Sequence, residues 1–188
     1  MDNHAGEAMS TVEIVDANAV RTIAINRPDR RNALDHDAIA RLRDAVDEAV
    51  ASPTARAIVL TGRGGAFSAG AYVREWVEIS AGKKPRPARD WVGEAWAADK
   101  ALKHGMVTEV PPADGLEGAA MAFAAQLAAG PTIAIGHAKR LLETGQTRSF
   151  PEQLEEKRKA GKICGATEDH KEGFAAANER REPRFFGR

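Results

Sequence analysis

The feature that most constrains the fold is a strand, a glycine-rich loop and a helix that follow one another without interruption. Residues Ala57–Leu60 form a short apolar run, which predicts a buried strand. Glycines crowd the loop over 62–71, and Val73, Trp76 and Val77 then recur at helical spacing. This succession predicts an α/β fold. It leaves two interpretations of the loop open, a site where the backbone approaches a ligand closely and a merely tight turn.

The loop differs from two well-known nucleotide-binding motifs. No Gly-Lys-Ser/Thr follows it, as a Walker loop requires, and its glycine spacing does not match the dinucleotide-binding fingerprint. Ser68 lies in Phe67-Ser68-Ala69-Gly70 rather than in Gly-x-Ser-x-Gly, so we assign it no nucleophilic role. Free N–H groups at the start of the following helix suit an anion, or a negative charge that develops during a reaction.

Strands and helices alternate in the first half of the chain, and the second half is nearly all helical. We expect a disordered lead over 1–10, an α/β core over 11–112 with an atypical bridge over 78–97, and a helical region over 113–188. Apolar and β-branched runs predict further strands, and amphipathic spacing with capping residues predicts the helices. The strands are expected over 11–15, 19–25 and 106–110, and the helices over 35–50, 95–104, 116–129 and 131–145, with two more that open at Ser149 and Thr167.

Composition and charge argue against several classes of protein. The 27 Lys and Arg residues balance 27 Asp and Glu residues, so bulk charge does not favour nucleic acid, and we interpret the basic stretch Lys83–Arg89 as a linker. The single cysteine, Cys164, and five scattered histidines predict neither a disulfide framework nor a metal site. No apolar run approaches the roughly 20 residues that span a bilayer. The first ten residues lack the apolar core of a secretory signal, so we expect a soluble, cytoplasmic protein without a membrane partner.

The pair Arg30-Arg31 beside Asn32-Ala33-Leu34 has the chemistry to hold a phosphate, because guanidinium groups match phosphate oxygens. Pro28 ends regular structure just before the pair, since proline cannot donate to a strand ladder. A solvated charged loop explains the same residues. The local sequence leaves both explanations open.

Three blocks of the sequence, in a fixed order, carry a resemblance to a known family. The first runs from Asn26-Arg27-Pro28 and Arg31-Asn32-Ala33-Leu34 through Ala57–Gly62 to Ala66-Phe67-Ser68-Ala69-Gly70-Ala71. The second is ADKALKHGMVTEVPP over 98–112, and the third joins GPTIAIGHAKRLL over 130–142 to EDHKEGFAAANERREPRFFGR over 168–188. Together they resemble the enoyl-CoA hydratase/isomerase family, the crotonase superfamily. The resemblance implies a truncated crotonase-like ββα core followed by a mostly helical C-terminal region.

The resemblance also implies an acyl-CoA-processing activity. In this family a thioester places its carbonyl oxygen between two backbone N–H groups, which stabilise the negative charge of the enolate. By resemblance the Ala71 N–H is the first donor, and Tyr72 stands where the family usually has Asp. The CoA thioester is the substrate, so no separate cofactor and no metal is implied, and the family's helical tails imply a homo-oligomer, a trimer or a hexamer. The residues expected to contact acyl-CoA are Arg31, Ala33, Ala69, Gly70, Ala71 and Tyr72.

The chain departs from the family in its centre, where only residues 78–97 bridge the two halves. Family members carry there further core strands, a glycine-rich loop with the second oxyanion donor, and the catalytic glutamates. We interpret the nearby acids as surface carboxylates: Glu75, Glu78, Glu94 and Asp99. The sequence therefore leaves open an enzyme of the hydratase type and an inactive remnant that binds acyl-CoA or only forms subunit contacts. The gap itself is compatible with a reduced core, with cover from oligomer contacts, or with a sequence shorter than the natural protein's.

Overall fold

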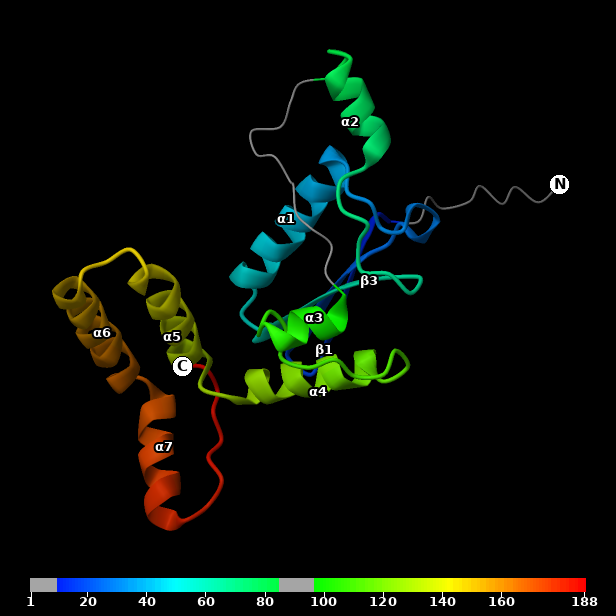
Figure 1. Cartoon of the computed structure of the whole chain (residues 1–188). Helices are drawn as coiled ribbons and strands as arrows, with labels where there is room; N and C mark the ends of the chain where they lie inside the picture. The colour runs from blue at the N-terminus through cyan, green and yellow to red at the C-terminus, as the bar shows by residue number, and fades with distance from the viewer. Residues whose placement is uncertain (1–9, 85–96) are drawn as a thin grey trace. The chain divides into compact units, whose positions relative to one another are not determined.

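The computed structural model describes residues 10–84 and 97–188, which fall into two compact units (Figure 1). The units divide between Met121 and Ala122. The boundary between 112 and 113 that the sequence suggests stays a prediction.

Several sequence-based predictions lie partly or wholly outside the described residues, among them the start of the helix expected over 95–104. The lead over 1–10 is described only at Ser10, and the bridge over 78–97 only at its two ends. Of the basic stretch Lys83–Arg89, only Lys83 and Lys84 are described, and Glu94 is not.

The first unit contains a three-stranded sheet in the order β1-β2-β3. Strands β1 (Val12–Ala17) and β2 (Val20–Ile25) form the predicted antiparallel hairpin, and β3 (Ala57–Gly62) lies parallel to β2. The hairpin turns at Asn18 and Ala19, whose φ angles are 51° and 61°. Two successive residues with positive φ suit the twist of paired strands, which explains why β1 continues to Ala17 rather than ending at the predicted residue 15.

Helix α1 (His36–Ala51) connects β2 to β3 and covers one face of the sheet. Asp35 caps it as predicted, since its side chain accepts a hydrogen bond from the Ala38 N–H at 3.0 Å. The helix turns small residues towards the sheet, which allows it to lie close to β1 and β2. The residues of this core are Val12, Ile23, Ala45 and Ala49, with Leu42 packed against them.

Strand β3 is an edge of the sheet, and no strand within residues 10–84 and 97–188 pairs with its outer side. The register pairs Leu60 with Ile23, so Leu60 and Ile58 lie on the face that carries α1. Because α1 packs against β1 and β2, Ile58 stays 41% exposed and Leu60 47% exposed. The reduced sheet thus has an apolar, unpaired edge.

Short helices and loops make up the rest of the first unit. The 3-10 turn η1 (Pro28–Arg30), helix α2 (Val73–Ser80) and helix α3 (Ala98–Lys103) lie where the sequence predicts a break and two helices. The predicted strand over 106–110 is wrong, because these residues form no regular structure before α4 (Leu116–Ala129). A strand needs a neighbour with which to pair, and the described sheet ends at β1 and β3 without including this segment.

The second unit begins within α4 and contains three further helices with local start signals: α5 (Thr132–Gly145), α6 (Phe150–Gly165) and α7 (Glu168–Glu179). The predicted capping box of Ser149 and Glu152 is confirmed, since the Ser149 N–H donates to the Glu152 carboxylate at 2.9 Å. Among the described residues no single helix is long and apolar enough to cross a membrane, although α4 and α5 together pass that test as a bent pair.

The last residues of the chain fold back along α7. Asp169 is 4% exposed, and its carboxylate accepts hydrogen bonds from the Phe186 N–H at 2.7 Å and the Gly187 N–H at 2.8 Å. Arg181 forms a two-point ion pair with Glu172, and this contact lowers the pKa of Glu172 to about 2. The C-terminal tail is therefore held by polar contacts at both of its ends.

Candidate functional site

The loop between β3 and α2 follows a path that requires its glycines. Gly64, Gly65 and Gly70 have φ angles of 71°, 80° and 81°, in the left-handed region that favours glycine. A Cβ atom at Gly62 would lie 2.2 Å from the Ala66 carbonyl oxygen, so this position accepts no side chain. The glycine-rich pattern is thus explained by positive φ angles at Gly64, Gly65 and Gly70 and by close approach of the loop at Gly62.

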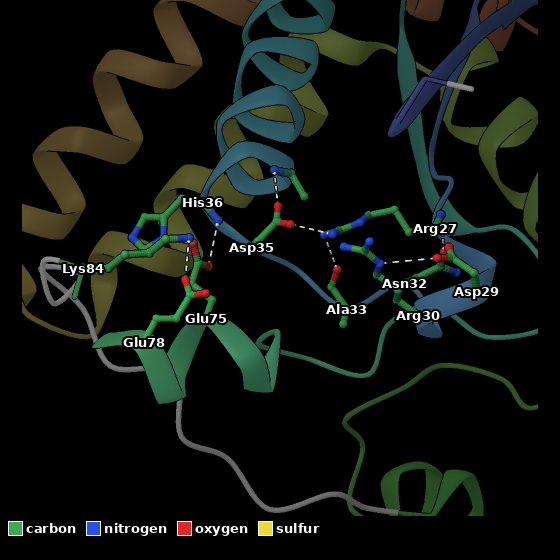
Figure 2. Close-up of polar contacts among 11 residues, drawn as sticks. Arg27, Asp29, Arg30, Asn32, Ala33, Asp35, His36, Glu75, Glu78 and Lys84 are labelled. Atoms are coloured by element: carbon green, nitrogen blue, oxygen red, sulfur yellow. Dashed lines mark hydrogen bonds and ion pairs between the residues drawn. The ribbon is translucent and has the colours of Figure 1, made fainter. Parts of the chain in front are cut away.

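The segment from Arg27 to Asp35 forms the second part of the site (Figure 2). The Arg27 guanidinium donates to the Ala33 carbonyl oxygen at 2.6 Å and forms an ion pair with Asp35. Partial burial raises the pKa of Asp35, but the hydrogen bonds from Ala38 and Arg27 outweigh it and lower that pKa below its usual range. The segment therefore carries a fixed ion pair at the start of α1.

Ala71 presents an N–H group that no described residue accepts. It forms a short parallel bridge with Leu34, in which the Leu34 N–H donates to Gly70 O at 2.8 Å and the Tyr72 N–H donates to Leu34 O at 2.9 Å. In a parallel pair these bonds flank the bridged residue, whose own N–H points to the opposite side. The Ala71 amide thus points away from Leu34. Ala71 also lies two residues before α2, so the bridge, and not the helix start we expected, leaves this amide unpaired.

The predicted contact residues lie on these two neighbouring segments. The Ala69 N–H donates to the Arg31 carbonyl oxygen at 2.9 Å, which joins the segments beside Gly70 and Ala71. The Arg31 side chain is exposed and forms no ion pair with a described residue. Ala33 is 6% exposed, and its N–H and carbonyl oxygen are both bonded within the segment. The structure therefore brings the predicted residues together, with Arg31 the most accessible charged group among them.

Tyr72 lies close to two arginines. The guanidinium carbon of Arg30 is 5.1 Å from the centre of the Tyr72 ring, and that of Arg27 is 5.6 Å from it. Both distances fall within the range of cation–π attraction. Each of these arginines also pairs with a carboxylate, Arg27 with Asp35 and Arg30 with Asp29, so the charge that no described acid pairs with lies on the neighbouring Arg31.

A cluster of His36, Glu75, Glu78 and Lys84 links α1 to α2 (Figure 2). Glu75 Oε1 lies 2.8 Å from His36 Nδ1 and 3.3 Å from Lys84 Nζ, and Glu75 Oε2 accepts the His36 N–H at 3.1 Å. Burial raises the pKa of Glu75, but these hydrogen bonds outweigh it and lower that pKa. Our interpretation of Glu75 as a surface carboxylate is wrong, because its side chain is 11% exposed and holds the start of α1.

Asn32 and Ser68 are the residues of this site that sequence reasoning missed. Asn32 is fully buried, and its side-chain amide contacts both segments. The only signal in the sequence is an asparagine in a break of regular structure, where its left-handed φ of 57° is tolerated better than for most residues. Among the described residues, no three or more His, Cys, Asp or Glu side chains are grouped so that they could hold a metal ion.

The comparison with protein families shows which family the Arg27–Asp35 segment and the glycine loop belong to. The family model described as enoyl-CoA hydratase/isomerase matches residues 16–90 and 89–188. The chain belongs to this family. The resemblance predicted from the sequence is therefore confirmed. The two matched parts overlap at 89–90, inside the bridge over 78–97 where the sequence predicts that the family's central block is missing.

Curated members of the enoyl-CoA hydratase/isomerase family match this chain over part of their length. The "Probable enoyl-CoA hydratase" of Mycobacterium bovis is 50% identical over 60 residues, which are 32% of this chain and 24% of that protein. The 1,2-epoxyphenylacetyl-CoA isomerase of Escherichia coli K12 is 29% identical over 97 residues, 52% of this chain and 37% of that protein. Each match spans less than half of the relative, so the activity of the whole relatives is, for this chain, a proposal.

Solved structures support the fold. An enoyl-CoA hydratase structure from Geobacillus kaustophilus superposes with a TM-score of 0.83 at 24% identity, covering 97% of this chain and 100% of that one. At this level of identity the likeness establishes the fold alone. The predicted fold class, an α/β crotonase-like core followed by a mostly helical region, is confirmed.

Proposed function

We propose that the chain binds an acyl-CoA thioester and stabilises its enolate form with the Ala71 amide. The observation that carries this proposal is the N–H of Ala71, which no described residue accepts and which the bridge points away from Leu34. A donor fixed by the fold needs no reorganisation when negative charge develops on a carbonyl oxygen. Family membership supplies the substrate class, because the named relatives act on CoA thioesters.

The exposed guanidinium of Arg31 beside the donor supports a ligand that carries phosphates. Arg31 is exposed and forms no ion pair with a described residue, and Arg30 lies over Tyr72. Guanidinium groups bind phosphate oxygens at two points, and CoA carries phosphates at its nucleotide end. We expect Arg31 to hold this end while the thioester reaches the Ala71 amide.

A second candidate is an acyl-CoA-binding protein without turnover. Glu75 and Glu78, the carboxylates that follow Ala71 most closely, are engaged in ion pairs with His36 and Lys84. A general acid or base needs to reach the substrate proton, so these ion pairs would have to break before Glu75 or Glu78 could act as one. This observation favours binding and enolate stabilisation over complete hydration chemistry.

One experiment with two ligands separates these functions. Acetoacetyl-CoA forms an enolate that absorbs in the near ultraviolet, so its absorbance reports the Ala71 donor without requiring an acid or base. A short enoyl-CoA reports hydration through loss of its conjugated absorbance. Enolate formation with hydration supports the enzyme, and enolate formation alone supports the binding protein. No enolate and no heat of binding overturn both.

Arg31→Ala tests the phosphate contact, with Arg43→Ala as its matched control. Arg43 is an exposed arginine of α1, so the control removes the same charge outside the proposed site. We expect Arg31→Ala to weaken acyl-CoA binding in calorimetry and Arg43→Ala to leave it unchanged. Equal weakening in both variants contradicts a specific role for Arg31.

We also propose that the helical second unit forms subunit contacts in a trimer or hexamer. Its helices expose several large apolar side chains, and exposed apolar surface of this kind is typical of sites where proteins contact one another. Sedimentation equilibrium tests this proposal, and a monomer at all concentrations rejects it. The most exposed of these side chains are Leu142 at 77%, Phe150 at 79% and Phe174 at 68%.

A further inference from the structure

All polar atoms of Asn32 are hydrogen-bonded, some within its own segment and the others to the loop after β3. Its side-chain Oδ1 accepts the Arg27 N–H at 2.8 Å, and its Nδ2 donates to Arg63 O at 2.8 Å and to Ala66 O at 2.6 Å. Its own N–H donates to Arg27 O at 2.8 Å. The side chain is fully buried, so each lost bond would leave a polar group without a partner.

Ser68 continues this network towards the proposed donor. The Ser68 hydroxyl donates to the Asn32 carbonyl oxygen at 2.8 Å, and its oxygen accepts the Gly70 N–H at 3.1 Å. The Gly70 carbonyl oxygen accepts the Leu34 N–H at 2.8 Å. Both polar groups of Gly70 are therefore occupied, and the next N–H along the chain, that of Ala71, is accepted by no described residue.

The space around Asn32 makes this arrangement specific. A Cβ atom at Gly62 would lie 2.6 Å from Asn32 Nδ2, so the amide fits only against a glycine. Asn32 adopts a φ angle of 57° and Arg31 one of 48°, which turns the Asn32 carbonyl oxygen towards Ser68. The network thus depends on the amide of Asn32 and on the backbone conformation that places it.

We propose that Asn32, acting through Ser68 and Gly70, is a positioning residue that keeps the Ala71 amide aimed at the thioester oxygen. The inference rests on the proposed function, since it concerns the donor assigned there. Asn32 and Ser68 do not touch the ligand. They fix the position and direction of the Ala71 N–H. Enolate stabilisation depends steeply on both, because the donor has to lie within hydrogen-bond distance of the developing charge.

The test compares three variants with the unchanged protein, using the absorbance of bound acetoacetyl-CoA enolate and its dissociation constant. Asn32→Asp keeps the size of the side chain and removes its two N–H donors. Ser68→Ala removes only the hydroxyl, and Ser68→Thr restores it. We expect the first two to lower the bound enolate fraction roughly tenfold or more, since a displacement of about 1 Å costs on the order of 100-fold. Ser68→Thr should recover most of that signal.

A loss of enolate with little change in the dissociation constant supports positioning, whereas a merely structural role lowers the enolate signal and raises the dissociation constant together, which overturns the inference. Ser52→Ala is the matched control, because the Ser52 oxygen also accepts backbone N–H groups in a loop, those of Thr54 and Ala55. If circular dichroism shows that Asn32→Asp is unfolded, Ser68→Ala decides. An unchanged enolate signal in folded Ser68→Ala overturns the inference, while no enolate with the unchanged protein overturns the proposed function instead.

Discussion

Replacing Ala71 with proline removes the one hydrogen atom on which the proposed chemistry depends. Proline has no N–H, and the bridge between residues 34 and 71 uses the Gly70 carbonyl oxygen and the Tyr72 N–H rather than the Ala71 amide. The variant therefore deletes a donor and breaks no described hydrogen bond. Few oxyanion donors can be removed so selectively, because most backbone amides also hold the fold.

The expected loss is that of a single oxyanion donor. Removing one such donor costs about 2.7–4 kcal/mol, or on the order of 10² to 10³ in rate. The free energy of unfolding should fall by less than the roughly 3 kcal/mol that proline costs inside a helix. Residue 71 lies outside α2, which begins at Val73, so the helix keeps all of its hydrogen bonds.

The assay is the absorbance of bound acetoacetyl-CoA enolate, with the dissociation constant measured in parallel by calorimetry. We expect Ala71→Pro to lose the enolate signal and to keep measurable binding through Arg31. Ala71→Ser is the matched control, because it changes the side chain and keeps the N–H. A folded Ala71→Pro protein with an undiminished enolate signal would refute the assignment of this amide as the donor.

Three further changes test the supports of the fold. Asp35→Ala removes the cap that accepts the Ala38 N–H and should lower the free energy of unfolding by about 1–2 kcal/mol in urea titrations, with an unchanged value arguing against the cap. Asp169→Asn weakens the anchor of the C-terminal tail and should raise its hydrogen exchange at residues 186–187. Because Arg181 lowers the pKa of Glu172 from 4.5 to about 2, the stabilisation is present above pH 4.5 and is lost as the pH falls towards 2. Over that pH interval the melting temperature of Glu172→Gln should fall by less than that of the unchanged protein. An equal fall contradicts a stabilising ion pair between Glu172 and Arg181.

The elements that the sequence predicts correctly are those with local signals. In the Asp35 cap and the Ser149 capping box, the side chain and the N–H group that donates to it are three residues apart. A short stretch of sequence therefore contains the whole interaction. The strand expected over 106–110 fails because pairing depends on a distant partner, which the described sheet does not provide. The pattern of apolar residues within a segment does not show whether that segment finds a strand to pair with in a reduced core.

The site shows the same limit at the level of single residues. Residue type makes the glycine loop and Arg31 candidates, and only the family resemblance assigns them to acyl-CoA, which stays a prediction. Asn32 contacts Arg63 and Ala66, more than thirty positions further along the chain, and no local pattern reveals this. The free amide of Ala71 was expected for another reason, the start of a helix, whereas the bridge to Leu34 produces it. Side-chain bonds between distant loops are therefore what the sequence could not supply.

The outer edge of β3, with which no described strand pairs, has a consequence for the protein in solution. The segment Ala57–Gly62 contains no charged residue and no proline, the two devices that usually prevent one sheet from adding to another. The net charge of the chain is +0, so copies that approach one another meet no overall repulsion. Scattering by concentrated samples should therefore increase steeply with concentration, and a lysine introduced at Leu60 should keep the solution clear.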